Sequence, residues 1–546
     1  MNILTGHNAL TKILLKLLTV IITSFSVSWH NNIVIGQTIG DYQSLASGNW
    51  NSGTSWQVYD GSIWQPCAAG DYPGVTAGAG TVYIQNNHTI TITADVTFPV
   101  GNLRIDGGNQ DSYLQFNPGV SLTVTGQTYL NSNSPNDEKA VLVDDGLFTT
   151  GSVNANSTAG AGGSPNSRDS YIRISSGTVR VMGDITLNSS QFRTYILFTG
   201  NGSLFVHGNI TGGIITSNIG GGNSAPASGT VIYNGAIAQT IGDYTYHNLT
   251  ADNTVGVTLN SNITVNNLLT MIAGNITTGS NTIILSNNSA ASLDHISGTI
   301  VGTISRAIST TTSVDYLFPV GTASNYRPAI INFSSLSTGI NISAGFIPDS
   351  PENFIPYSDN GSQLNNAFTE GYWRFSSSGT PASVYTITLT ADGFSSYPLD
   401  SFARITGRDN ANASWRALGT HGSLTGNEIS RTGITSLNTS SFDFTLATCQ
   451  TPIFLGYSYE RNISIDHTKV AGGADLYNFP LMISLSDQDF LKTAPAGQVY
   501  NPGGYDIIFA DEQYNQLDHQ LETYNGTNGD LIAWVRIPTL SCSSIQ

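Results

Sequence analysis

Charged side chains are scarce in this sequence of 546 residues. Only 10% of the residues are Asp, Glu, Lys or Arg, whereas globular proteins average about 25%. Acidic residues outnumber basic ones by 36 to 19, which gives a formal net charge of −17, and no basic cluster occurs along the sequence. Because affinity for a phosphate backbone depends on clustered Lys and Arg, we expect no nucleic-acid partner.

Cysteine is rarer still. The sequence contains three, Cys67, Cys449 and Cys542, and none has the C-x-x-C spacing that is typical of zinc sites and thiol redox centres. One disulfide at most can form among them. Stability must therefore come from extensive packed sheets and not from cross-links, and we expect neither a metal nor another cofactor.

Long hydrophobic runs are also missing, except near the N-terminus. There, Lys12 and Lys16 accompany an apolar stretch, residues 17–27, which is shorter than the roughly 18 to 20 residues of a membrane-spanning helix. The pattern predicts a signal peptide over residues 1–37, cleaved at its end. The alternative is an uncleaved anchor that extends through Ile35. With cleavage, the mature chain has no membrane span and is extracellular or on the outer cell surface.

Glycine, with 58 residues, is plentiful, as are Thr, Ser and Asn. Together with Val, Ile and Tyr, these residues suit pleated strands and the turns between them, so the composition predicts an all-β protein. Between residues 80 and 300 one sequence pattern recurs: a short strand with alternating apolar residues, then Gly or Asn, then a second short strand. It is found around Gly126, Gly183 and Gly208. This alternation places apolar side chains on one face of each strand.

Such strands bury their apolar faces only when several units stack. Repeats of roughly 20 to 25 residues then produce a continuous core, as in a parallel β-helix. We therefore expect residues 38–300 to form a β-solenoid in which Asn and Gly at the corners adopt left-handed backbone conformations. A flat β-sandwich would use the same alternation and is the alternative.

After residue 300 the rhythm of the strands changes. Strands separated by turn signals predict an antiparallel β-sandwich over residues 301–450. Trp373 and Trp415 lie within this segment. They are either sugar-stacking aromatics or core residues, and the core is the commoner location for lone aromatics in alternating strands.

Residues 44–97 contain a G-x-W phrase, a second tryptophan and a strand that ends in a turn with the sequence His-Thr. This segment resembles the start of large exported surface proteins of Bacteroidetes-type bacteria. The positions of that pattern are occupied here by Gly48, Trp50, Trp56 and His88. Residues 229–285 look like the filler repeat of the same proteins. The resemblance implies that the solenoid is a right-handed parallel β-helix.

Residues 459–541, from YERNISIDH to LIAWVRIPTLS, resemble the bacterial family known as domain of unknown function 2341. The resemblance implies a separate β domain over residues 456–546. In that family a further strand usually follows, and often a lectin-like jelly roll. We therefore expect the domain to be truncated here, and residues 531–540 to form an edge strand with a partly uncovered apolar face.

The densest group of candidate acid–base residues lies in this last domain. Its members are Asp506, Asp511, Glu512, Asp518, His519 and Glu522. Carboxylates near a histidine are able to act as acid and base or to ligate a metal, but the turn and strand pattern favours a solvated rim. Asp487 and Asp489 either cap a turn or hold calcium, and D-x-D alone is far short of a calcium loop. His88 is expected to pack or to hydrogen-bond at a corner.

Motifs for known catalytic chemistry, such as G-x-S-x-G, H-E-x-x-H and the phosphate loop, are missing from the sequence. The sequence therefore predicts a secreted or cell-surface structural or adhesive protein without catalytic activity. The alternative is a carbohydrate-binding accessory module of a glycan-degrading protein. In both cases the expected partner is a surface polysaccharide or a host glycan.

Overall fold

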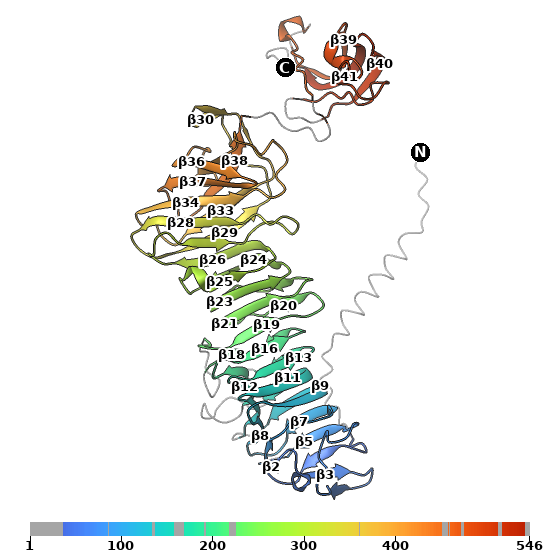
Figure 1. Cartoon of the computed structure of the whole chain (residues 1–546), viewed down its shortest axis with the longest axis vertical. Helices are drawn as coiled ribbons and strands as arrows, with labels where there is room; N and C mark the ends of the chain where they lie inside the picture. The colour runs from blue at the N-terminus through green and yellow to red at the C-terminus, as the bar shows by residue number, and fades with distance from the viewer. Residues whose placement is uncertain are drawn as a thin grey trace. The chain divides into compact units, whose positions relative to one another are not determined.

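The computed structural model describes residues 36–85, 87–133, 137–157, 169–189, 193–217, 225–359, 361–449, 457, 459–470, 474–511 and 516–540. These residues are all-β: their strands form large mixed sheets, and four short 3-10 helices lie between strands (Figure 1). Within these ranges, no helix is long and apolar enough to cross a membrane. Nearly all of the expected signal peptide lies outside them, as does Cys542. The chain divides after Ile172 into two compact units.

The first unit begins with a small antiparallel layer. In it, β3 (Trp56–Tyr59) pairs with both β1 (Tyr42–Ser44) and β4 (Trp64–Pro66). Trp50 and Trp56 are fully buried, with their ring centroids 5.0 Å apart. The Trp56 indole donates a hydrogen bond of 2.7 Å to the carbonyl of Trp50. The tryptophans of the G-x-W phrase are therefore the core of this layer.

The rest of the first unit consists of parallel strands in two sheets. One contains β5 (Thr81–Ile84), β7 (Asn102–Asp106), β9 (Val120–Ser132) and β11 (Gly146–Ser157), and the other contains β2 (Gly48–Asn49), β6 (Thr89–Ile92), β8 (Ser112–Phe116) and β10 (Lys139–Val143). Each strand pairs in parallel with the next strand of its sheet. Val82 and Leu103 lie side by side and are fully buried, so the predicted alternation holds here.

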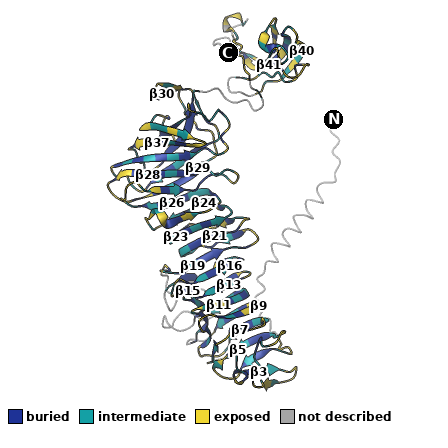
Figure 2. Cartoon of the chain, in the orientation of Figure 1, coloured by how far each residue is buried: buried dark blue, intermediate teal, exposed yellow. Residues whose placement is uncertain are grey.

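The second unit begins with the same kind of parallel pairing. Its strands up to residue 308 are β13 (Thr178–Val181), β14 (Ile185–Asn188), β15 (Thr194–Phe198), β16 (Ser203–Val206), β17 (Ile210–Gly212), β18 (Ile214–Thr216), β19 (Thr230–Tyr233), β20 (Gln239–Ile241), β21 (Thr245–Asp252), β22 (Val257–Leu259), β23 (Ile263–Ala273), β24 (Ile276–Leu285), β25 (Leu293–His295) and β26 (Ile300–Ile308). Leu204, Val231 and Leu249 follow one another in register on β16, β19 and β21. All three are buried. Buried and partly buried residues alternate along β13, β14 and β16, whereas every residue of β15 is buried (Figure 2).

Asparagine side chains join neighbouring parallel strands. The Asn102 Oδ1 atom accepts a hydrogen bond of 2.9 Å from the backbone N–H of Gln127, and Asn262 Oδ1 accepts one of 2.8 Å from Thr282. Left-handed backbone conformations belong mainly to glycine, and Asn87 is the one described asparagine between residues 80 and 300 with a positive φ. The expectation that asparagine supplies left-handed corners is therefore wrong: its side chain instead satisfies backbone donors of the next strand.

From β26 onward the pairing becomes antiparallel, as the sequence predicts for residues 301–450. One sheet continues from β26 through β29 (Ile340–Ile347), β33 (Tyr372–Ser377), β38 (Phe442–Thr448) and β35 (Arg404–Arg408). A second has the order β27 (Asp315–Phe318), β28 (Ala329–Leu336), β34 (Ser383–Thr390), β37 (Glu428–Ile434) and β36 (Thr420–Thr425). Three short strands complete this part: β30 (Tyr357–Asp359), β31 (Ser362–Leu364) and β32 (Asn366–Ala367). Buried ion pairs join Asp443 to Arg374 and Arg408.

The last described segment contains a three-stranded antiparallel sheet, in which β41 (Asp530–Leu540) lies between β39 (Leu476–Leu485) and β40 (His519–Asn525). The expectation that residues 531–540 form an edge is therefore wrong for residues 531–535, which have hydrogen-bonded neighbours on both sides. Among the described residues, 537–540 pair only with β39. Leu531 and Ala533 are buried in the core of this segment, whereas Trp534 is 40% exposed on the opposite face. The predicted alternation of this strand is confirmed.

Candidate functional site

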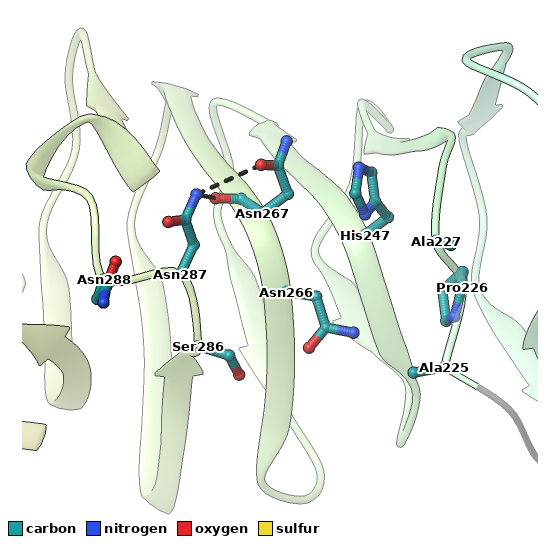
Figure 3. Close-up of a pocket in the computed structure, with 9 residues that line it drawn as sticks. All are labelled: Ala225, Pro226, Ala227, His247, Asn266, Asn267, Ser286, Asn287 and Asn288. Atoms are coloured by element: carbon teal, nitrogen blue, oxygen red, sulfur yellow. Dashed lines mark hydrogen bonds between the residues drawn. The ribbon is translucent and has the colours of Figure 1, made fainter.

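A hollow of about 600 Å³ lies over β21, β23 and the end of β24, and we call it the asparagine groove (Figure 3). Its lining is polar except for one short wall. The lining residues are Ala225, Pro226, Ala227, His247, Asn266, Asn267, Ser286, Asn287 and Asn288. No carboxylate, ammonium or thiol belongs to this lining.

A local irregularity of the strand pairing explains why so many amides meet here. The register of β21 with β23 shifts by one residue between Tyr246 and Asn248. His247 therefore faces two residues of β23, Asn266 and Asn267, which is the arrangement of a β-bulge. A bulge breaks the alternation of a strand and re-aims its side chains. Both asparagines thereby line the groove.

A chain of hydrogen bonds fixes one row of these amides. The Asn267 Nδ2 atom donates to Asn248 Oδ1 at 2.7 Å, across 19 residues of sequence. Asn287 Nδ2 donates to both the backbone oxygen and Oδ1 of Asn267, at 3.2 and 3.3 Å and across 20 residues. Figure 3 shows the bonds between Asn287 and Asn267 as dashed lines. The two separations differ by one residue, so this row follows the repeat of the strands.

Other polar side chains of the groove have their hydrogen-bonding groups available. Among the described residues, none donates to or accepts from the side chains of Asn266, Ser286 and Asn288. Burial lowers the pKa of His247 below its usual value, so the imidazole is neutral near pH 7 and offers one donor and one acceptor. The groove therefore presents uncharged donors and acceptors to solvent.

This chemistry suits a neutral polyhydroxyl ligand. A sugar hydroxyl both donates and accepts, and each amide offers a carbonyl oxygen and an NH₂ group in fixed relative positions. An anionic ligand would find no cation in the lining, and a cationic ligand would find no carboxylate. The Ala225–Ala227 wall adds a small apolar contact.

Trp373 and Trp415, the two candidate sugar-stacking residues, are both buried. Trp373 is 0% exposed, and its indole donates a 2.7 Å hydrogen bond to the carbonyl of Arg327. Trp415 is 2% exposed, and the Arg408 guanidinium lies 4.5 Å from its ring centroid. No sugar is able to stack on either ring, so the structure favours their interpretation as core residues.

Asp487 and Asp489 lie at a turn and not around a common centre. Asp487 has a left-handed φ of 55°, and its N–H donates to Asp530 Oδ1 at 3.0 Å. The Asp489 carboxylate pairs with Lys492 at 2.7 Å. No group of three His, Cys, Asp or Glu side chains able to hold a metal is found in the part of the chain that the structure describes.

The other acids of this domain also have separate partners. Asp506 accepts backbone N–H groups of Tyr500 and Asn501, and Glu522 accepts the indole N–H of Trp534 at 2.6 Å. Asp518 pairs with Arg536, and the His519 ring lies within hydrogen-bonding distance of the carbonyls of Leu517 and Ile507. Asp511 is partly exposed, and Glu512 lies outside the described residues. Asp506, Asp518, His519 and Glu522, as the described structure places them, thus have partners other than one another.

Two smaller expectations concern His88 and the cysteines. His88 Nδ1 lies 2.8 Å from the Ser44 hydroxyl, so the predicted hydrogen bond is present. Cys67 and Cys449 are free thiols. Burial, reinforced by the nearby Asp71 carboxylate, raises the pKa of Cys67 to about 12, which leaves this thiol protonated and unreactive at neutral pH.

The sequence reasoning overlooked one perturbed carboxylate, Glu138 at the start of β10. Its Oε2 atom accepts hydrogen bonds from the hydroxyls of Tyr113 at 2.9 Å and Tyr171 at 3.1 Å. Burial raises the pKa of Glu138, while the two tyrosine hydrogen bonds oppose that shift. The sequence shows Glu138 and the two tyrosines in different repeats. Only the parallel register of the strands brings the three side chains together.

Comparisons with known proteins found no matching family model, no matching curated protein and no matching solved structure. The resemblances to exported Bacteroidetes-type proteins and to domain of unknown function 2341 stay predictions from the sequence.

Proposed function

We propose that the chain is a secreted or cell-surface structural and adhesive protein without catalytic activity. Residues 38–300 form a right-handed parallel β-helix in this proposal, and residues 301–450 form a β-sandwich. The parallel registers of residues 81–157 support the first element, because every strand continues onto a neighbour of the same sheet. Stacked units of this kind produce a stiff, extended body, which suits a spacer on a cell surface.

The adhesive contact that we propose is the asparagine groove, and its ligand is a surface polysaccharide or a host glycan. The observation that carries this proposal is a set of neutral side chains, Asn266, Ser286 and Asn288, beside a fixed row of amides. None of the three has a side-chain hydrogen-bond partner among the residues that the structure describes. Single contacts of this kind are weak. Repetition of the protein on a surface multiplies them into useful avidity.

Binding to a glycan array tests the proposal. The double variant Asn266→Ala, Asn288→Ala removes two amides without touching the hydrogen-bonded row. With roughly 0.5 to 1.5 kcal/mol for each hydrogen bond, affinity should fall about tenfold. Asn260→Ala removes an exposed asparagine outside the groove lining and should leave binding unchanged. Equal binding by the double variant and the native chain would rule out the groove as the adhesive contact.

A further inference from the structure

A second surface of the molecule carries aromatic side chains in a continuous line. It lies in the first unit, on the outer face of the sheet that contains β5, β7 and β9. The ring centroids of Tyr59 and Trp64 are 5.3 Å apart, and those of Trp64 and Tyr83 are 6.3 Å apart. The Arg104 guanidinium lies 4.4 Å from the ring centroid of Tyr129. We call these five residues the aromatic row.

Strand periodicity explains why the row exists. Tyr83, Arg104 and Tyr129 are in register on three successive parallel strands. Their chain neighbours Val82 and Leu103 are fully buried on the opposite face, so the three side chains point outward, where they are partly exposed. Because adjacent strands lie about 4.8 Å apart, Tyr83 and Tyr129 are separated by roughly 10 Å along the row.

Neutral amides border the row on one side. Gln43 Nε2 donates to Gln57 Oε1 at 2.7 Å, and Gln85 Nε2 donates to Gln43 Oε1 at 3.3 Å. Gln43, the middle member of this amide chain, is in register with Tyr83 on the neighbouring strand, so the amides lie beside a ring of the row. Its members leave further N–H and carbonyl groups for an external ligand.

The row carries little net charge. The one cation, Arg104, forms an ion pair with Asp106 on the same strand. The Trp64 indole N–H has no hydrogen-bond partner among the residues that the structure describes, although the ring itself packs between Tyr59 and Tyr83. The surface thus combines flat apolar faces with uncharged donors and acceptors at their edges.

From this arrangement we propose that the aromatic row binds an extended, neutral polysaccharide chain that runs across the strands. Sugar rings present apolar C–H faces to aromatic side chains and hydroxyls to the surrounding amides. A row that extends over several strands offers stacking positions to successive sugars of one chain, whereas a single sugar would use only one of them. The pairing of Arg104 with Asp106 favours a neutral over an acidic chain.

A protein partner fits the row less well. The fully buried centre of a stable protein interface is mostly apolar, but the row contains no large aliphatic side chain and is bordered by glutamine amides. The inference rests on the proposed adhesive function. It narrows the ligand of that function to one class, extended neutral polysaccharides. It uses a surface separate from the asparagine groove, so the two sites are testable independently.

The test is co-sedimentation of the full-length chain with insoluble cellulose, chitin and xylan, together with affinity electrophoresis in gels that contain a soluble β-glucan. We expect binding to at least one of these chains and none to a monosaccharide. Trp64→Ala and Tyr83→Ala should each weaken binding about tenfold, and Tyr83→Phe, which keeps the ring, should bind like the native chain. Tyr505→Ala removes a tyrosine that is 83% exposed elsewhere and serves as the control.

The outcomes separate the two proposals. Unchanged binding by both Trp64→Ala and Tyr83→Ala overturns the aromatic row as a site. If binding is then lost in the variant Asn266→Ala, Asn288→Ala, the proposed adhesive function stands without the row. Binding to acidic polysaccharides alone, or to a protein alone, also overturns the inference. Because Tyr83 lies on a different strand from Trp64, a folding defect in one variant leaves the other as an independent test.

Discussion

A buried glutamine in the second unit is the sharpest test of how its parallel strands are held together. Gln239 is 1% exposed, and its side chain forms four hydrogen bonds. The Oε1 atom accepts from the N–H of Gly235 at 2.7 Å and from Asn253 Nδ2 at 2.8 Å. The Nε2 atom donates to the carbonyls of Val206 and Gly208, at 2.9 and 2.5 Å. One side chain thus links segments more than 30 residues apart.

Gln239→Ala leaves two buried backbone groups without their partner, the N–H of Gly235 and the carbonyl of Gly208, while the Val206 carbonyl keeps its hydrogen bond from the N–H of Asn234. Each costs about 1 to 3 kcal/mol when it is unpaired, so local stability should fall by about 2 to 6 kcal/mol. Amide hydrogen exchange of the full chain should then accelerate about 100-fold across residues 230–260 and remain unchanged across residues 81–106. Gln65→Ala, which removes an exposed glutamine, is the control. Exchange that accelerates by less than about threefold, or equally in both segments, would refute the reasoning.

Three further predictions concern other parts of the chain. Trp56→Ala removes a fully buried ring and should destabilise the N-terminal layer by about 3 to 5 kcal/mol, measured as a loss of exchange protection there. Cys67, with its pKa raised to about 12, should react with iodoacetamide at pH 8 far more slowly than a free cysteine. Its rate should increase as the pH rises toward 12. Rapid alkylation at pH 8 would contradict the raised pKa of this thiol. Residues 456–546 expressed alone should aggregate, because Trp534 and its neighbours leave one sheet face uncovered, whereas residues 38–300 should be soluble and resistant to protease. A monodisperse, sharply melting fragment 456–546 would show that the face needs no cover.

Local strand periodicity was readable from the sequence because it depends on near neighbours alone. Leu531, Ala533 and Val535 alternate with Trp534 and Arg536, and the structure buries the first set and exposes the second, as the pattern predicts. The order of strands in a sheet was not readable in the same way. Nothing local identifies β41 as the central strand, because its partner β39 lies more than 40 residues earlier in the chain.

The role of asparagine was the clearest misreading. Composition rules assign Asn to left-handed turns, but Asn102 and Asn262 act through their side chains on strands 20 to 25 residues away. Such contacts are predictable from the sequence only when the number of residues in each repeat is known. The bulge at Asn266 and Asn267 left a trace in the sequence, since two asparagines follow Val265 where one glycine stands in other repeats.

Exposure of aromatic residues also depended on tertiary structure. The sequence singled out Trp373 and Trp415, which are buried, and passed over Trp64, which is partly exposed. All three lie near strands, so local pattern alone does not separate them. What decides their exposure is whether a second layer packs on the same face of the strand.

The central claim, that the chain binds glycans without cleaving them, is tested most directly by one measurement on the purified full-length chain. The chain is incubated with a panel of plant and bacterial polysaccharides, and bound protein and released reducing sugar are quantified in the same samples. The account predicts bound protein and no release of sugar above a protein-free blank. Release of sugar that disappears in Glu138→Gln, or in another single carboxylate-to-amide variant with unchanged binding, would contradict it.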